Sequence, residues 1–167
     1  MRFRHCLFAS AVCMLLINAT PLPAANAAPV DICSLLTEAE VSAAVGVSMN
    51  SGLPVTPIGT HARPGAACKW LPSGGFRPGA PPPIVNDLRL WAFPEEYFER
   101  DMVGENVTSV SGLGDEAYYV NMSGGYTVMD VNKGALCVQV VWHGPNWDHQ
   151  KIIDAEQTIA AQVLSEL

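Results

Sequence analysis

Basic residues are scarce in this chain. Its 167 residues include 9 lysines and arginines against 16 aspartates and glutamates, which gives a formal net charge of −7. Proteins that bind nucleic acid rely on a basic surface to contact the phosphates, so this composition excludes that class. Only 15% of the residues are charged while 49% are apolar, which excludes a disordered acidic tail. The composition is that of one folded domain.

Motifs that carry chemistry are also lacking. No serine lies in a nucleophile elbow, and no glycine-rich loop leads into a helix with a phosphate-binding lysine. Cys137 and His143 lie six residues apart on one predicted strand, about 20 Å, which is too far for a nucleophile and its base. His143 and His149 have a spacing outside the usual range for zinc ligands, and we expect them, like His61 and Asp148, to lie in loops or at element ends. We therefore predict no enzyme, no metal site and no cofactor.

Long hydrophobic runs are confined to the N-terminus. Two arginines precede an apolar run over residues 7–17, and small residues follow up to an A-x-A motif that ends at Ala27. This is the pattern of a secretory signal peptide. Asparagine and two prolines interrupt the run before it reaches the roughly 20 residues of a membrane-spanning helix, and an uncleaved anchor is the alternative. We predict a signal peptide over residues 1–27 and one secreted or periplasmic domain over residues 28–167, with no later membrane span.

Export places the remaining cysteines in an oxidising compartment, where disulfides persist. Cys6 and Cys13 fall within the signal peptide, which leaves Cys33, Cys68 and Cys137. Three pairings are possible. We favour Cys33 with Cys68 because both flank irregular chain, whereas Cys137 lies in a strongly apolar strand where a thiol packs as a small hydrophobic group. A reactive or metal-binding thiol at Cys137 is the alternative.

Hydrophobic periodicity and turn residues predict an α+β fold. Thr37 and Glu40 form a capping box that opens a short helix ending at Gly46. The other predicted elements are strands over 67–71, 87–93, a segment ending at 120, 126–131 and 135–143, a helix from Pro94 to Gly104, and a C-terminal helix over 148–167. We expect an antiparallel sheet with a C-terminal three-stranded meander, flanked by an N-terminal, a middle and a C-terminal helix.

Two glycines predict a tight turn before the strand that ends at residue 120. Gly112 and Gly114 allow positive φ on either side of Leu113. Asp115 can then accept hydrogen bonds from turn amides, a structural role that we favour over a catalytic one. Asp115 and Glu116 point to opposite faces of an extended segment, which disfavours a paired acid and base.

Three segments together resemble a known family. They are the run from Asp31 to Val41 (DICSLLTEAEV), the later Cys-Lys-Trp at 68–70, and GLGDEA at 112–117. They resemble exported bacterial domains of unknown function, many of them lipoproteins of actinobacteria, which are related in outline to the extracellular sensor domains of some receptor kinases. The resemblance implies a fold similar to the PsbP and Mog1 type and a disulfide between Cys33 and Cys68. This chain lacks the lipid-attachment cysteine, so the membrane anchor is not carried over, and the family supplies no established catalytic residues.

The sheet face turned away from the C-terminal helix is the candidate binding surface. Alternation along the strand over 87–93 places Arg89, Trp91 and Phe93 on that face. Aromatic rings beside an arginine are typical of surfaces that bind an amphipathic ligand or a protein partner. The alternative is that the predicted helix after Pro94 covers this face.

These observations predict a non-catalytic binding or sensor-type domain that takes a small molecule or a protein partner. An accessory or immunity protein that binds and blocks an exported enzyme is the second hypothesis, and a hydrolase without a recognisable motif is the third. The proline-rich loop over residues 72–83 is a second candidate contact region.

Overall fold

A computed structural model describes the chain over residues 31–56, 65–74, 87–99, 106–122, 126–143 and 148–167. The predicted α+β class is confirmed by a seven-stranded antiparallel sheet and two α-helices. In chain order the elements are η1 (Ile32–Ser34), α1 (Glu38–Val45), β1 (Leu53–Pro54), β2 (Ala66–Trp70), β3 (Leu88–Pro94), η2 (Glu95–Tyr97), β4 (Val107–Ser109), β5 (Glu116–Met122), β6 (Tyr126–Lys133), β7 (Leu136–Trp142) and α2 (His149–Glu166).

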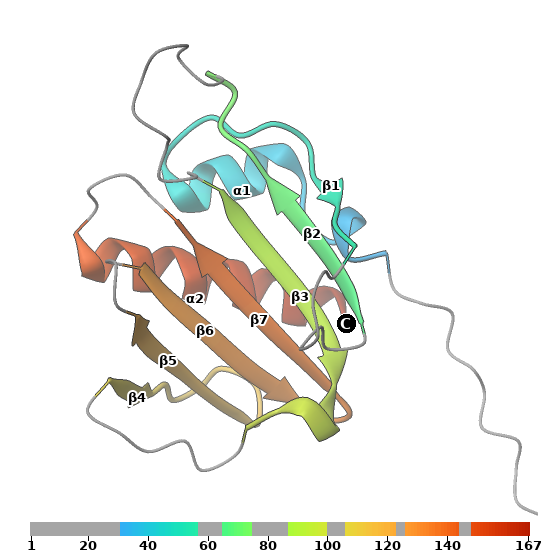
Figure 1. Ribbon diagram of the computed structural model, residues 1–167, viewed down its shortest axis with the longest axis vertical. Helices are drawn as coiled ribbons and strands as arrows, with labels where there is room; N and C mark the ends of the chain where they lie inside the picture. Colours follow the sequence, from blue (N-terminus) through green and yellow to red (C-terminus); the bar gives the residue numbers. More distant parts are fainter. Residues whose placement is uncertain (1–30, 57–64, 75–86, 100–105, 123–125, 144–147) are drawn as a thin grey trace, which may run out of the picture.

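The strands lie in the order β1-β2-β3-β7-β6-β5-β4 (Figure 1). From β4 to β7 each strand pairs with the next one in the sequence, and β7 then pairs with β3. The last strand therefore lies in the middle of the sheet, between β3 and β6. This arrangement brings residues about 50 positions apart in the sequence into direct cross-strand contact.

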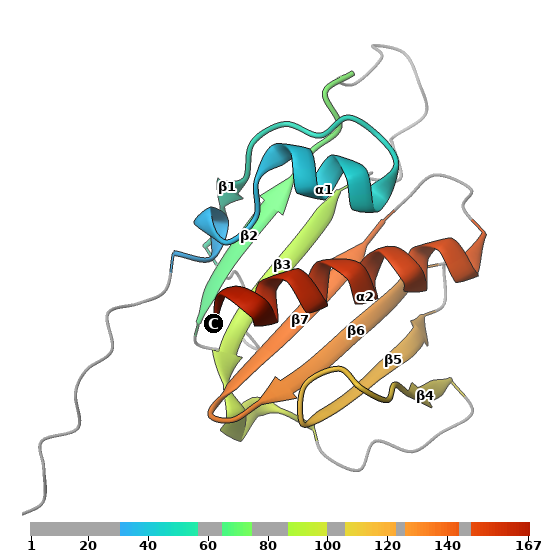
Figure 2. The ribbon, with the colours of Figure 1, turned by 180° about the vertical axis from the view of Figure 1, so that it is seen from behind.

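Both helices lie on one face of the sheet, which we call the inner face (Figures 1 and 2). α1 begins with the predicted capping box: the Thr37 hydroxyl accepts from the Glu40 amide at 3.3 Å, and the Glu40 carboxylate accepts from the Thr37 amide at 2.7 Å. It ends at Gly46, whose φ of 66° is left-handed. α2 begins at the Asp148 N-cap, which accepts from the Gln150 amide. The predicted bounds of these two helices are confirmed.

The main hydrophobic core lies between the inner face and the two helices. Each fully buried Leu, Ile or Met in it stabilises the fold by about 1.5–3 kcal/mol. The largest side chains that are fully buried in it are Trp70, Trp142, Ile32, Met49, Leu88, Leu90, Met129, Ile152 and Ile159. A disulfide joins Cys33 in η1 to Cys68 in β2 beside this core, as predicted, and Cys137 is buried as a free thiol.

The predicted helix from Pro94 to Gly104 is wrong over the residues that the structure describes. Only a single 3-10 turn, Glu95–Tyr97, follows β3, and Phe98 returns to an extended conformation with φ −76° and ψ 124°. The reason is tertiary packing. Phe98 is 7% exposed and packs with Phe93, Tyr118 and Cys137 in a second small cluster on the outer face, and this burial outweighs the helix-start pattern of proline and two glutamates. Residues 100–105 lie outside the described part of the chain.

The glycine turn before β5 forms as predicted. Gly112 and Gly114 have φ values of 79° and 63°. The Asp115 carboxylate accepts from the Gly134 amide at 2.7 Å, and the Asp115 amide donates to the Asn132 carbonyl at 2.8 Å. Asp115 is therefore a structural acid that ties this turn to the β6–β7 turn. The predicted signal peptide, His61 and residues 75–83 of the proline-rich loop lie outside the described residues.

Candidate functional site

The outer face of the sheet, opposite α1 and α2, faces the viewer in Figure 1. Neither α-helix of the described residues lies on it. The pairing register aligns one side chain from every strand in a single row, which we call the central row. From β1 to β4 in sheet order it consists of Leu53, Lys69, Arg89, Val141, Val128, Val120 and Val107.

One end of the central row is cationic. Lys69 on β2 and Arg89 on β3 are direct cross-strand partners, and like charges in this position are destabilising. Arg89 Nε donates to Asp87 Oδ2 at 2.6 Å, so one charge has a partner. Lys69 makes no hydrogen bond or ion pair with any residue that the structure describes. This end of the row is therefore a positive spot on an acidic protein.

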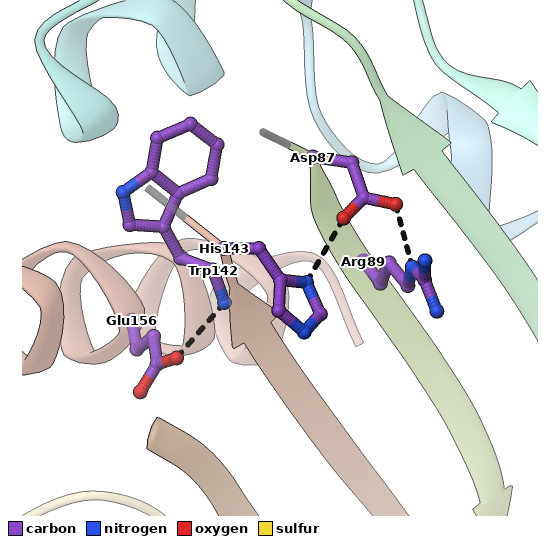
Figure 3. A network of polar contacts seen from close by, with 5 residues as sticks. All are labelled: Asp87, Arg89, Trp142, His143 and Glu156. Carbon is purple, nitrogen blue, oxygen red and sulfur yellow. Dashed lines mark hydrogen bonds and ion pairs between the residues drawn. The ribbon is translucent and has the colours of Figure 1, made fainter. Parts of the chain in front are cut away.

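Asp87 holds two side chains at the edge of this spot. It is 1% exposed, and its other oxygen, Oδ1, lies 2.9 Å from His143 Nδ1 (Figure 3). The His143 amide also donates to the Asp87 carbonyl at 3.0 Å. Burial by itself would raise the pKa of Asp87, but the hydrogen bonds and charges of His143 and Arg89 outweigh it and lower the pKa below its ordinary value. Asp87 is therefore an ionised carboxylate.

An ionised carboxylate can only accept hydrogen bonds, so His143 carries a proton on Nδ1. Its ring also packs against the Tyr126 ring, with 4.7 Å between the ring centroids. These two contacts fix the orientation of the imidazole, whose side chain is 21% exposed. One buried carboxylate, Asp87, thus holds both His143 and Arg89 at the outer face.

The other end of the central row is apolar. Its four valines lie on adjacent strands, with Val141 buried and Val128, Val120 and Val107 half-buried. Strands lie about 4.7–4.9 Å apart, so the distance from Arg89 to Val107 across four strand spacings is about 19 Å. Met122, one row away, is 39% exposed. The row therefore combines a cationic end with an extended apolar surface.

The residues predicted as contacts, Arg89, Trp91 and Phe93, do share the outer face, but they differ in access. The Arg89 side chain is 39% exposed. Trp91 is half-buried against the second cluster, and beside it Gln139 donates to Asp130 at 2.8 Å. Phe93 is 2% exposed and belongs to that cluster. Arg89 and Trp91 can contact a ligand directly, whereas Phe93 supports the surface from within.

The described residues that were weighed as metal ligands are not brought together. His149 hydrogen-bonds to Asn121 on β5, Asp148 caps α2, and Cys137 is buried with its thiol 3.7 Å from the Asn132 side-chain oxygen. Among the described residues, no group of three or more histidines, cysteines or acids could hold a metal ion. The same residues contain no helix with the length and hydrophobicity needed to span a membrane.

A buried acid that sequence analysis passed over lies on the inner face. Glu156 of α2 is fully buried and accepts from the Trp142 amide at 2.9 Å (Figure 3). It also accepts from the Thr127 hydroxyl at 2.5 Å, and so ties α2 to both β7 and β6. Burial, helped by the charge of Asp130, raises the pKa of Glu156 to about 8 against the opposing effect of its two hydrogen bonds. The available signal was an acid within the apolar stripe of the C-terminal helix.

A groove of about 780 Å³ lies between α1 and α2 on the opposite side of the molecule. Its acids already have local partners: Glu40 belongs to the α1 capping box, and Asp154 accepts from the Gln150 side chain at 2.8 Å. Small and half-exposed side chains complete its lining, among them Ala44 and Thr158. The groove offers few groups that would select a ligand.

No family model, curated protein or solved structure matches the chain.

Proposed function

We propose that the chain is an exported, non-catalytic binding domain of the sensor type that takes a small-molecule ligand on the outer face of its sheet. The observation that carries this proposal is the Asp87 arrangement: one buried carboxylate orients Arg89 and His143 on a face without a described α-helix. A site whose polar groups are held in place before binding loses less entropy when the ligand arrives. The half-buried ring of Trp91 lies in the row next to Arg89.

Export is supported by three features. A disulfide such as Cys33–Cys68 persists in oxidising compartments, and residues 1–27 have the pattern of a signal peptide. The chain also resembles exported bacterial domains with a sheet of the PsbP and Mog1 type. In the sheet, strands β4 to β7 supply the apolar half of the proposed site.

A partner-binding protein, for example an accessory or immunity protein that blocks an exported enzyme, is the second candidate. It is favoured by exposed apolar side chains at both ends of the face, Leu53 at 48% and Met122 at 39%, because such side chains can belong to a protein interface. A hydrolase is less favoured. Asp87 and His143 resemble the orienting acid and the base of a catalytic triad, respectively. However, no described serine, threonine or cysteine hydrogen-bonds to His143.

Thermal unfolding of the purified protein against a panel of anionic, cationic and neutral small molecules tests the proposal. A ligand at 100 times its Kd stabilises the folded state by about 2.7 kcal/mol, enough to raise Tm by several degrees. We expect at least one compound to do so, and Trp91→Ala to reduce the shift. If no compound raises Tm, while the protein binds one exported enzyme at an interface that Trp91→Ala disrupts, the partner-binding alternative replaces the proposal.

A further inference from the structure

The central row specifies the class of ligand. We propose that the outer face binds an anionic amphiphile, with a carboxylate or phosphate headgroup at Lys69 and Arg89 and an unbranched hydrocarbon tail along the three half-buried valines of the central row, Val128, Val120 and Val107. This inference rests on the proposed function and deepens it by naming the ligand chemistry.

The charge balance of the row indicates an anionic headgroup. Lys69 and Arg89 supply two adjacent positive charges, and Asp87 offsets only one of them. The next acid on the face, Asp130, lies two strands away from Arg89 in the neighbouring row. Because Asp87 occupies Arg89 Nε, the terminal nitrogens of the guanidinium keep their donors for a bidentate anion. An anionic headgroup would relieve the repulsion between the two cations.

The apolar half of the row indicates a linear tail. Val141 lies next to Arg89 but is buried, so it supports this line from within. The half-buried valines of β6, β5 and β4 continue the line as one row of branched hydrocarbon. Tyr126 and Met122, which are direct cross-strand partners, flank this line in the adjacent row. A straight tail that leaves the headgroup position would cross the strands over these side chains. Each methylene that becomes buried is expected to tighten binding about threefold to fourfold.

Two other surfaces give weaker support for a ligand-binding site. The groove between α1 and α2 has acids that are already engaged in local hydrogen bonds. The exposed edge strands β1 and β4 are two and three residues long, too short to template a paired strand. Within the described part of the chain, the central row combines Lys69, which has no hydrogen-bonding or ion-pairing partner there, with a line of half-buried valines.

Calorimetric titration of the purified protein with amphiphiles below their micelle concentrations tests the inference. Dodecanoate and dodecyl phosphate are expected to bind with one molecule per chain, and their relative affinities show which headgroup is preferred. Dodecyltrimethylammonium, with the same tail and the opposite charge, is expected to bind at least 30-fold more weakly. Acetate and inorganic phosphate, which have no tail, are expected to give no measurable binding. Decanoate is expected to bind about tenfold more weakly than dodecanoate.

Two matched variants locate the site. Lys69→Gln is expected to weaken dodecanoate binding at least tenfold, whereas Lys151→Gln removes the same charge from α2 beside the other groove and is expected to have no effect. Val128→Thr keeps the shape and strand preference of the side chain, and its hydroxyl is expected to weaken binding of the tail. Circular dichroism and Tm of each variant establish that it is folded.

Three binding or assembly results would each overturn the inference, and so would a complete absence of binding. The three are equal binding of dodecanoate and dodecyltrimethylammonium, equal losses in the two lysine variants, and dimerisation through the outer face that Val128→Thr reverses. In the absence of any amphiphile binding, the proposed function itself still stands if another compound raises Tm and Trp91→Ala abolishes the effect, and it falls if no compound does.

Discussion

The Asp87 carboxylate lies 2.9 Å from the imidazole of His143, although 56 positions separate the two residues in the sequence. The contact forms because β3 and β7 are neighbours in the sheet, so the residue before β3 and the residue after β7 meet at one end. A buried acid that holds a histidine and an arginine stabilises the fold and shapes the surface at the same time.

Replacing Asp87 by alanine is expected to lower the free energy of unfolding by about 2 kcal/mol at pH 7, because two charge-assisted hydrogen bonds are lost. The pKa of Asp87 is lower in the fold than its ordinary value of 3.8, so its contribution is present above about pH 4 and is lost as pH falls through the folded-state pKa. Urea unfolding at pH 7 and pH 3 measures both effects.

Asp154→Ala is the control for this experiment because Asp154 is an exposed acid whose side chain accepts only a local hydrogen bond from Gln150. We expect it to change stability by no more than about 0.5 kcal/mol. Equal losses in the two variants at pH 7 would contradict the structural role assigned to Asp87.

Replacing Glu156 by glutamine is expected to stabilise the protein in alkaline solution. The pKa of Glu156 is raised from 4.5 to about 8, so the folded state binds the proton more tightly and stability falls as pH rises from about 4.5 to about 8. Glutamine keeps an oxygen that accepts from the Trp142 amide, and its side-chain amide can donate to the Thr127 hydroxyl, without the ionisation. We expect the variant to be about 2–4 kcal/mol more stable than the parent at pH 9 and nearly equal to it near pH 4.5.

The measurement is Tm of both proteins from pH 4.5 to pH 9. The difference between the two curves isolates Glu156 from the other titrating groups. Parallel curves would show that Glu156 does not carry the pH dependence.

Loss of the disulfide, as in Cys33→Ser with Cys68→Ser, is expected to cost about 3–4 kcal/mol, because the bridge closes a loop with a sequence separation of 35. Cys137→Ala keeps the bridge and serves as the comparison. Alkylation under denaturing, non-reducing conditions followed by mass spectrometry should label Cys137, and Cys33 and Cys68 only after reduction. Labelling of Cys33 without reductant would refute the pairing.

Gly114→Ala is expected to destabilise the turn before β5 by about 2 kcal/mol or more. Its φ is 63°, and an added Cβ would lie 2.4 Å from the Asn132 carbonyl oxygen. Gly112 also has a positive φ, but a Cβ there meets nothing within 4 Å, so Gly112→Ala should cost only about 1 kcal/mol. Denaturant unfolding of the two variants separates the steric cost of the close approach at Gly114 from the conformational cost of a positive φ. Equal losses in the free energy of unfolding would rule out the close approach.

Local signals predicted the parts of the fold that depend on neighbouring residues. Thr37, Glu40 and Gly46 fixed the bounds of α1, and alternation along β3 placed Arg89 and Trp91 on one face. The helix expected after Pro94 failed because Phe98 packs against Tyr118, twenty residues further along the chain, and such a contact leaves no local signal.

The candidate site was only half predictable for the same reason. Arg89 was identified from its own strand, but its pairing with Lys69 depends on the register between β2 and β3. The line of valines depends on four strand pairings at once. Glu156 was visible as an acid in an apolar stripe, yet its partners Thr127 and Trp142 come from strands that only the three-dimensional fold places beside α2.

The most direct test of the outer face as the binding site is a map of backbone amide chemical shifts during titration with dodecanoate. The account predicts saturable shifts centred on Lys69, Arg89, Val141 and Val128, with little change along α1 and α2. Shifts confined to the residues between the two helices, or no saturable shift with any compound that raises Tm, would contradict it.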